Sequence, residues 1–573
     1  MSVVTNRTSA TSALFAGLLW SALSACSNPQ EPVAAITPTT PVTPPVITPP
    51  VVVPPVVVPP PTPTAKAFDD VVVIAVIDSN INPYHWDYLA AKMPQAGTDA
   101  ALPLDQDPAT WLPGHPGAAA FKSYQALNLT LDATDPTRST AELHTADAAE
   151  WAKINYSEGS SNDAVNYYWM PGTKVIGHVA FSPGFLVDPV LGQLLGPSTG
   201  PIDTFAVDSH GIGTSSVAAG NIHGSCPNCL IVYVHGTAEQ ANAWVSQQDW
   251  IDLQTNSWGA SVIGGPVRDL VYAASDTELQ RTTVERGQAI VFSAGNGLAN
   301  DFGAPHTTLL SSQKGPDWII SVGAISPEDD SSYFGHGKPA DISSYGDGYP
   351  SATGGDGSVT ASGPFGGTSN AAPVMAGMYG EALHRLRKQL PGASRMQADG
   401  VIAAGLLPCG AANSDCALAD GQLTVHELTA ALFRSAQYTV TGTNIGSSLL
   451  GLYVEIPMSA NQKELEFLAE GHGSLFGKLK GDENYEAELA RITGFATGEW
   501  FAEQDADQKA WMIADSICRQ AAWGSWEHGY TAGNEAPALS PTWPVRTYLA
   551  EACPLTLPPV IAAEKLYYGG LPF

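Results

Sequence analysis

Basic residues are scarce in this chain. Its 573 residues include 25 Lys and Arg against 55 Asp and Glu, which gives a formal net charge of -30. A field of this sign repels phosphate backbones, so we expect no nucleic-acid partner. The same acidity favours solubility and attracts cations, but acidic residues alone do not identify a calcium site.

A long hydrophobic run is also lacking. The apolar stretch 13–23 is too short to span a bilayer comfortably, and Arg7 is the only charged residue before it, as in a signal peptide. The stretch ends in Leu-Ser-Ala-Cys at Cys26, which resembles a bacterial lipobox. This resemblance implies that residues 1–25 are a lipoprotein signal peptide and that Cys26 becomes lipidated. The alternative is an ordinary signal peptide with an incidental cysteine.

Residues 26–67 offer little from which a core could form. From Pro29 to Thr64 the chain is mostly Pro, Val and Thr, with repeated Val-Val-Pro-Pro-like units. Proline lacks an N–H donor and favours polyproline II, so we expect an extended, semi-rigid spacer. Such a spacer would hold a folded body away from the membrane, and the mature protein would need no transmembrane helix.

Cysteine is limited to seven residues, and six remain when Cys26 is set aside. An even number suits an oxidising compartment. The sequence leaves the connectivity open, although local pairing favours three bridges: Cys226–Cys229, Cys409–Cys416 and Cys518–Cys553. The Cys-Pro-Asn-Cys spacing of the first pair could also belong to a redox site or to half of a zinc site. No second Cys-x-x-Cys exists and the pair leads into an apolar run rather than a helix, so we interpret it as a structural bridge.

Between about residues 68 and 435, apolar runs typical of strands alternate with patterns typical of helices. The run 71–77 is continuously apolar, as expected of a strand buried on both faces of a parallel sheet. Further strands are expected at 230–234, 289–293 and 318–322, and helices at 211–220, 238–250 and 369–389. This alternation predicts an α/β fold with a central parallel sheet.

Two regions depart from the alternation. Residues 88–173 have weak periodicity, and we expect an insertion with short helices rather than a part of the sheet. Residues 436–573 are expected to form a mainly helical C-terminal region of open role, with its tryptophans in the core. Before it, Thr424-x-x-Glu427 predicts a capping box. The calcium-loop alternative lacks the other acidic ligands there, and His426 lacks the second histidine of a zinc-protease helix.

Three short motifs contain candidate catalytic residues. Asp78 directly follows the first apolar run, at the strand end where open α/β sheets place functional residues. His210-Gly leads into a helix of small residues, which allows close packing beneath the histidine. A glycine-rich segment precedes Ser369, which is expected at the start of a helix. The unpaired N–H groups and the dipole of a helix start favour a developing negative charge. Pro373 is expected in the first helical turn, where its missing N–H is not needed.

These motifs resemble those of the subtilisin-like serine proteases, the subtilases. Asp, His and Ser occur in the family's order, and the string 367–373, Gly-Thr-Ser-Asn-Ala-Ala-Pro, matches every fixed position of the family's serine signature. The likeness covers roughly residues 68–435. It implies a three-layer fold with a mostly parallel central sheet, and a catalytic triad of Asp78, His210 and Ser369.

Other segments extend the resemblance or depart from it. Ser293–Gly297 is similar to the family's oxyanion segment, which implies Asn296 as a side-chain donor. Ser257-Trp258-Gly259 resembles the strand that pairs with substrate and lines the primary specificity pocket. Asn80 stands where the family usually has a glycine, and asparagine tolerates a positive φ better than most residues. Gly213 stands where a second histidine is common, but that histidine is not part of the triad.

The resemblance implies a serine endopeptidase that hydrolyses peptide bonds through an acyl-enzyme, with protein or peptide substrates as its partners. The chemistry requires no cofactor and no metal ligands are identified, although a structural calcium ion stays open. Together with the lipobox, this predicts an exported protein that is anchored through Cys26 to the bacterial cell envelope, at the outer membrane or cell surface. The oligomeric state is not indicated.

Three other interpretations remain beside this one. The Ser-Glu-Asp carboxyl peptidases share the fold and a similar serine string, but the intact His210-Gly context argues against them. A non-catalytic cell-surface binding module on the same fold would be favoured by loss of a triad residue or of Asn296, and none is lost. A structural lipoprotein of the envelope, in which the C-terminal region does the binding, is the third.

Overall fold

The buried strand β1 (Val73–Asp78) lies near the middle of a ten-stranded sheet in the computed structural model. The structure describes residues 68–94, 101–154, 165–181, 210–258, 283–293, 319–325, 342–389, 423–435 and 483–513, with gaps of one or two residues inside some of these ranges, and the short stretches 332–334, 409–412, 444–449 and 452–457. The expected signal peptide, lipobox and spacer at 1–67 lie outside the described residues.

The sheet is mostly parallel. Its strands follow the order β10 (Ile342–Tyr345), β8 (Ile319–Ile325), β7 (Ala289–Ser293), β6 (Leu253–Asn256), β1, β5 (Leu230–His235), β4 (Val175–Ala180), β3 (Asn166–Trp169) and β2 (Ser123–Ala126), and β9 (Ser332–Phe334) pairs with β8. Among the described strand pairs of this sheet, β3–β4 and β8–β9 are antiparallel and the others are parallel. The four strands expected from sequence are all present, within a few residues of the expected bounds.

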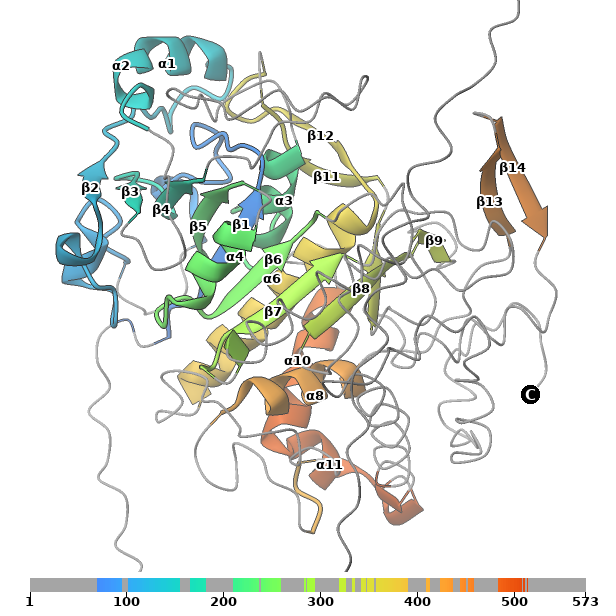
Figure 1. The fold of residues 1–573 in the computed structure, drawn as a ribbon. Helices are drawn as coiled ribbons and strands as arrows, with labels where there is room; N and C mark the ends of the chain where they lie inside the picture. The colour runs from blue at the N-terminus through green and yellow to red at the C-terminus, as the bar shows by residue number, and fades with distance from the viewer. Residues whose placement is uncertain are drawn as a thin grey trace, which may run out of the picture. The chain divides into compact units, whose positions relative to one another are not determined.

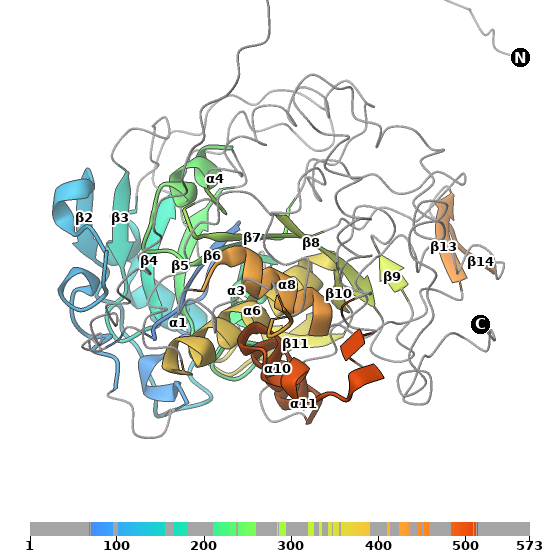
Figure 2. The same ribbon diagram turned by 90° about the horizontal axis from the view of Figure 1, so that it is seen from below.

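Helices cover both faces of this sheet (Figures 1 and 2). The side chains of Ile74 and Val76 pack in one core with α3 (His210–Ala219) and α6 (Thr368–Gln389). Those of Ala75 and Ile77 point to the opposite face and pack in a second core with α4 (Glu239–Ser246). Because successive side chains of a strand alternate between faces, a strand in the middle layer must be apolar throughout. This confirms the predicted three-layer α/β fold.

The expected insertion, residues 88–173, differs in part from the prediction. It contains the expected short helices, namely η1 (Ala90–Lys92), η2 (Pro108–Thr110), η3 (Ala118–Ala120), α1 (Thr140–Ala146) and α2 (Ala148–Trp151). It also supplies β2 and β3, so the prediction that it stays out of the sheet was wrong. The aromatic run Tyr167–Trp169 favours a strand, but its partner β4 comes from outside the region, and such pairing leaves no local signal.

From residue 423 onward, the described part of the chain contains helices and one hairpin. Helix α8 (Val425–Ser435) begins with the predicted capping box: Glu427 N donates to Thr424 Oγ1 over 3.1 Å, and Thr424 N donates to Glu427 Oε2 over 2.8 Å. Beyond it come the hairpin β13 (Asn444–Leu449) and β14 (Leu452–Pro457), which was not expected, and the helices α10 (Glu483–Thr497) and α11 (Glu499–Glu503).

Helix α10 belongs to the same body as the sheet. Leu489 and Ile492 lie in the core shared with α3 and α6, and the Tyr485 hydroxyl donates to the Ser225 carbonyl over 2.6 Å. The expected boundary at 435/436 therefore does not separate two independent cores. Trp500 packs against this shared core, as expected for the tryptophans of this region, whereas Trp511, Trp523 and Trp526 lie outside the described residues. Within the described part of the chain, no helix has the length and apolarity to cross a membrane.

A disulfide joins Cys226 and Cys229 between α3 and β5, which confirms the first predicted pair. Both cysteines are fully buried in the core, and a Cβ added to Gly380 of α6 would lie 2.7 Å from Cys229 Sγ. Cys409 is also disulfide-bonded, while Cys416 and the third expected pair lie outside the described residues. The close packing against α6 supports a structural role for the first bridge.

Candidate active site

Asp78 is a buried carboxylate at the carboxyl end of β1, with an exposed fraction of 2 %. Its Oδ1 accepts from the backbone N–H of Ser79 over 2.7 Å, and its Oδ2 accepts from Thr214 Oγ1 over 2.9 Å. His210 Nδ1 lies 2.9 Å from Oδ1 and 3.1 Å from Oδ2. A buried charge is stable only when hydrogen bonds replace its hydration, and the turn and helix α3 supply them.

His210 is the first residue of α3, and its ring is fixed from two sides. Its Nδ1 contacts Asp78, and the edge of the Phe365 ring meets it with the ring centroids 5.4 Å apart. Since a carboxylate accepts only, the bond places the proton of a neutral ring on Nδ1 and leaves Nε2 as the basic nitrogen. The imidazole is therefore oriented to accept a proton on the side away from Asp78.

Ser369 lies in the first turn of α6, after Gly367, whose φ is +80°. The Ser369 hydroxyl donates to the Ser257 carbonyl over 3.3 Å, and the Ser257 hydroxyl donates to the Ser369 carbonyl over 3.0 Å. Pro373 is the reason that this carbonyl needs an external donor, because it stands four residues later and has no N–H to complete the helical bond. The expectation that its missing N–H is not needed was therefore wrong.

The three predicted triad residues converge on one edge of the sheet. Strands β1 and β6 are parallel neighbours, with Ile77 paired to Asn256. Asp78 and Ser257 therefore follow at the same edge, where Asp78 holds His210 and Ser257 holds Ser369. The contacts bring a basic imidazole and a helix-start hydroxyl to the carboxyl ends of two adjacent strands.

Two positions where the sequence departs from the subtilase pattern have structural explanations. Asn80 does not have a positive φ, so the tolerance invoked for it is not needed. At Gly213 an added Cβ would lie 2.7 Å from Phe365 Cδ2. A larger side chain would displace the ring that contacts His210, so glycine at 213 and Phe365 fit each other.

The other predicted site residues are only partly described. Trp258 follows Ser257 at the end of β6, and its ring meets that of Phe292 edge-on, with centroids 6.0 Å apart. Its indole nitrogen is buried without a hydrogen-bond partner among the described residues. Gly259 and Asn296 lie outside the described residues.

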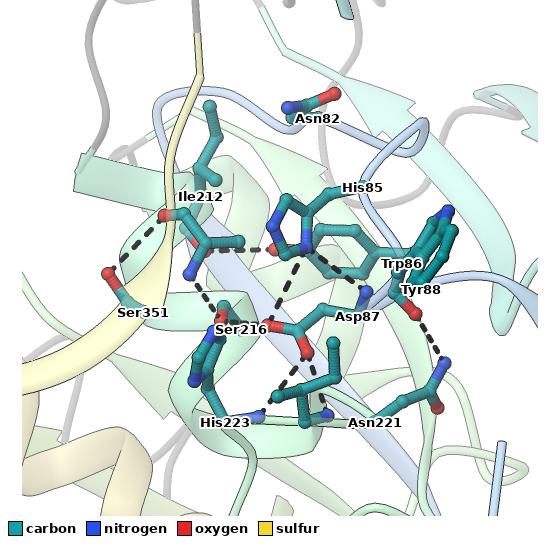
Figure 3. Close-up of polar contacts among 12 residues, drawn as sticks. Asn82, His85, Trp86, Asp87, Tyr88, Ile212, Ser216, Asn221, His223 and Ser351 are labelled. Atoms are coloured by element: carbon teal, nitrogen blue, oxygen red, sulfur yellow. Dashed lines mark hydrogen bonds and ion pairs between the residues drawn. The ribbon is translucent and has the colours of Figure 1, made fainter. Parts of the chain in front are cut away.

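A second buried carboxylate, Asp87, fastens the segment after β1 to α3, and sequence reasoning missed it. It accepts from Ser216 Oγ over 2.5 Å and from the backbone N–H groups of Ile222 and His223 over 2.7 and 3.3 Å (Figure 3). Ser216 in turn accepts from the Ala352 N–H over 2.8 Å. The only sequence signal is a charged residue among bulky apolar ones in Tyr-His-Trp-Asp-Tyr.

The same network reaches the hairpin of β11 (Tyr349–Ala352) and β12 (Ser362–Phe365). His85 Nε2 lies 3.0 Å from the Ala361 carbonyl, and Asn82 Nδ2 donates to the Thr353 carbonyl over 2.8 Å. This hairpin leads directly into α6. The network therefore joins the three segments that carry Asp78, His210 and Ser369.

Two histidines on the same sheet are buried in neutral form. Desolvation lowers the pKa of His178 to about 3, with a smaller effect of the nearby His235. Burial also lowers the pKa of His235 to about 4, although the backbone of Ser79 and the charge of Asp78 act in the opposite direction. His235 lies on β5, next to β1, where it pairs with Asp78, and His178 lies on β4, on the other side of β5.

Substituting Asp87→Asn should destabilise the fold, because one of the two acceptor oxygens becomes an NH2 group and at least one buried donor that faces Asp87 loses its acceptor. We expect the free energy of unfolding to fall by about 1–3 kcal/mol, as for other unsatisfied buried donors. Urea denaturation measures the change, and Asp135→Asn, at an exposed position, serves as the matched control with little effect. Equal stability of both variants would contradict a fastening role for Asp87.

The buried histidines predict a loss of stability in mild acid. Above pH 6.5 both states carry neutral rings, so there is no penalty. As pH falls from 6.5 toward about 4, the unfolded chain binds protons that folded His178 and His235 do not, and stability falls by up to about 1.4 kcal/mol per pH unit and histidine. His178→Phe removes one of these groups, and its unfolding free energy should fall less steeply over pH 4–6. An identical slope in both proteins would refute the assignment.

Comparison with known proteins identifies the family of this chain. The structure titled "Crystal structure of a cold adapted subtilisin-like serine proteinase" aligns at 16 % identity and a TM-score of 0.28, covering 58 % of this chain and 87 % of that one. No curated protein matches the sequence. The profile of the Subtilase family matches residues 69–404, more than half of the chain and the whole span from β1 to beyond α6. The chain belongs to the subtilase family of serine peptidases.

Proposed function

We propose that this protein is a serine endopeptidase in which Ser369 attacks the peptide carbonyl, His210 moves the proton and Asp78 orients the imidazole. The observation that carries the proposal is the double contact between His210 Nδ1 and the Asp78 carboxylate, at 2.9 and 3.1 Å. This contact leaves Nε2 as the base, and it stabilises the imidazolium that forms when the serine proton is taken up.

The reaction follows in two steps of the same kind. Ser369 Oγ forms a bond to the carbonyl carbon as its proton passes to His210, which then protonates the leaving amine to give an acyl-enzyme. Water then attacks the acyl-enzyme, with His210 again as base. The bond to Ser369 Oγ breaks, the serine regains its proton from His210, and the carboxylic acid product is released. The Ser369 hydroxyl donates to the Ser257 carbonyl, so it must turn toward His210 for the first attack.

The negative charge that develops on the substrate carbonyl oxygen must be stabilised by hydrogen-bond donors. The first N–H groups of a helix have no partner within it, so the Ser369 N–H in the first turn of α6 is suited to this task. We propose Asn296 as the second donor, on its sequence context alone. The segment Ser257–Gly259 is the proposed binding strand for protein or peptide substrates, and the chemistry uses no cofactor.

Labelling with a fluorophosphonate probe tests the nucleophile. Wild type should react, whereas Ser369→Ala and His210→Ala should not, and their kcat on a protein substrate should fall on the order of 10⁶-fold because the two residues act as a unit. The matched controls Ser123→Ala and His144→Ala change the same residue types within the insertion and should keep full activity. A wild type that is folded but neither labelled nor active would instead support a non-catalytic binding module.

We further propose that the protein is exported and tethered to the cell envelope through a lipid on Cys26. Support comes from the Leu-Ser-Ala-Cys string after the apolar stretch 13–23 and from the Pro-rich spacer that follows.

Metabolic labelling with a radioactive fatty acid tests the tether. Wild type should carry the label and sediment with membranes, whereas Cys26→Ser should be unlabelled, because it lacks the thiol to which the lipid is attached. An unlabelled wild type would leave an ordinary signal peptide as the explanation of the N-terminus.

A further inference from the structure

The turn that carries Asp78 is held from the side by the neighbouring strand β5. The Gly236 N–H donates to the Asp78 carbonyl over 3.0 Å, and the Tyr233 hydroxyl donates to the Asn80 carbonyl. His235 is the sheet partner of Asp78, and its ring interacts with the backbone of Ser79, the residue between Asp78 and Asn80. Each of the three residues of the turn thus contacts β5.

The Tyr233 hydroxyl also lies against the start of the helix that carries the histidine. A Cβ added to Gly211, the residue after His210, would lie 2.0 Å from this hydroxyl oxygen and 2.5 Å from the Asn80 carbonyl oxygen. The turn, β5 and α3 are therefore in close contact at Gly211. Any side chain at position 211 would collide with the Tyr233 hydroxyl and the Asn80 carbonyl. No other side-chain hydroxyl approaches Gly211 as closely among the described residues.

The Tyr233 side chain has no freedom to leave this position. It is fully buried, and its ring stacks on that of His178 at a centroid distance of 5.8 Å and an interplanar angle of 22°. The side chains of His178, His235 and Asp78 lie on the same side of the sheet as that of Tyr233. A tyrosine with a fixed ring holds its hydroxyl in one place, as a positioning group must.

We propose that Tyr233 is a positioning residue for the Asp78–His210 pair, because its hydroxyl fixes the turn after Asp78 against the first turn of α3. The inference rests on the proposed function in so far as this pair is the acid–base couple. Removing the hydroxyl takes a buried donor from the Asn80 carbonyl, so the turn must relax to find another. A small shift of Asp78 relative to His210 Nδ1 weakens proton transfer and leaves the substrate-binding strand unchanged.

Tyr233→Phe removes only the hydroxyl, and Tyr485→Phe is its matched control. Both hydroxyls are buried and donate to a backbone carbonyl, but the Tyr485 hydroxyl bonds Ser225, away from the pair. With the active sites counted by fluorophosphonate, kcat should fall roughly tenfold in Tyr233→Phe, the effect of one hydrogen bond, with KM unchanged. The control should keep kcat within about twofold, whatever each variant loses in thermal stability.

A conservative replacement and a spectroscopic measurement separate positioning from folding. 4-Aminophenylalanine at position 233 restores a donor and should recover most of kcat. In a Ser369→Ala background, where no turnover is needed, the low-field NMR resonance of the His210 Nδ1 proton should move upfield in Tyr233→Phe and stay in place in Tyr485→Phe.

Three outcomes would overturn the inference. They are an unchanged Nδ1 resonance in Tyr233→Phe, a kcat per active site equal to that of the control, and a Tyr233→Phe chain that fails to fold, which would give the hydroxyl a purely structural role. If wild type is inactive and unlabelled, the proposed function fails, but the resonance still decides whether Tyr233 positions the pair.

Discussion

The buried carboxylate of Asp78 is the constraint on which the surrounding structure depends. A negative charge at the end of an apolar strand must be met by donors, and these come from the Ser79 N–H, the Thr214 hydroxyl and His210 Nδ1. Two of the three donors belong to α3. The helix must therefore approach β1 closely, which explains why it consists almost entirely of small residues and begins with a glycine after the histidine.

The opposite end of β1 is held by the same kind of interaction. Asp252 accepts from the Val73 N–H over 2.8 Å and forms a buried ion pair with Arg387 of α6, at 2.5 Å. Arg387 also donates to the Val71 carbonyl over 2.5 Å. One carboxylate at each end thus ties β1 to a helix of the same layer, to α6 at its start and to α3 at its end. Breaking such a pair leaves an uncompensated buried charge, so both ends are fixed strongly.

Ser369 is held by a hydrogen bond that replaces a missing helical bond, rather than by a charged group. Pro373 removes one helical hydrogen bond from the Ser369 carbonyl, and the Ser257 hydroxyl replaces it. The replacement comes from the strand next to β1, so the irregularity at the start of α6 determines which strand the serine contacts. The Asp87 network adds a second tie, because it joins α3 to the hairpin that leads into α6.

The sequence alone determined the layers of the fold and selected the residues of the proposed site. Continuous apolar runs such as 71–77 require a strand in a middle layer, and the small-residue stretch after His210 requires a closely packed helix, because both patterns are local. Motif context was sufficient to select Asp78, His210 and Ser369 for the same reason.

Only the tertiary structure decided what depends on pairing between distant segments. It placed β2 and β3 in the sheet and α10 in the shared core. It also matched Gly213 to Phe365 and brought the Tyr233 hydroxyl to the turn of Asp78. These contacts join residues far apart in the chain, and no spacing or periodicity records such a contact. For that reason the sequence indicated which residues we propose as reactive, while the contacts that hold them in place became visible only in the folded chain.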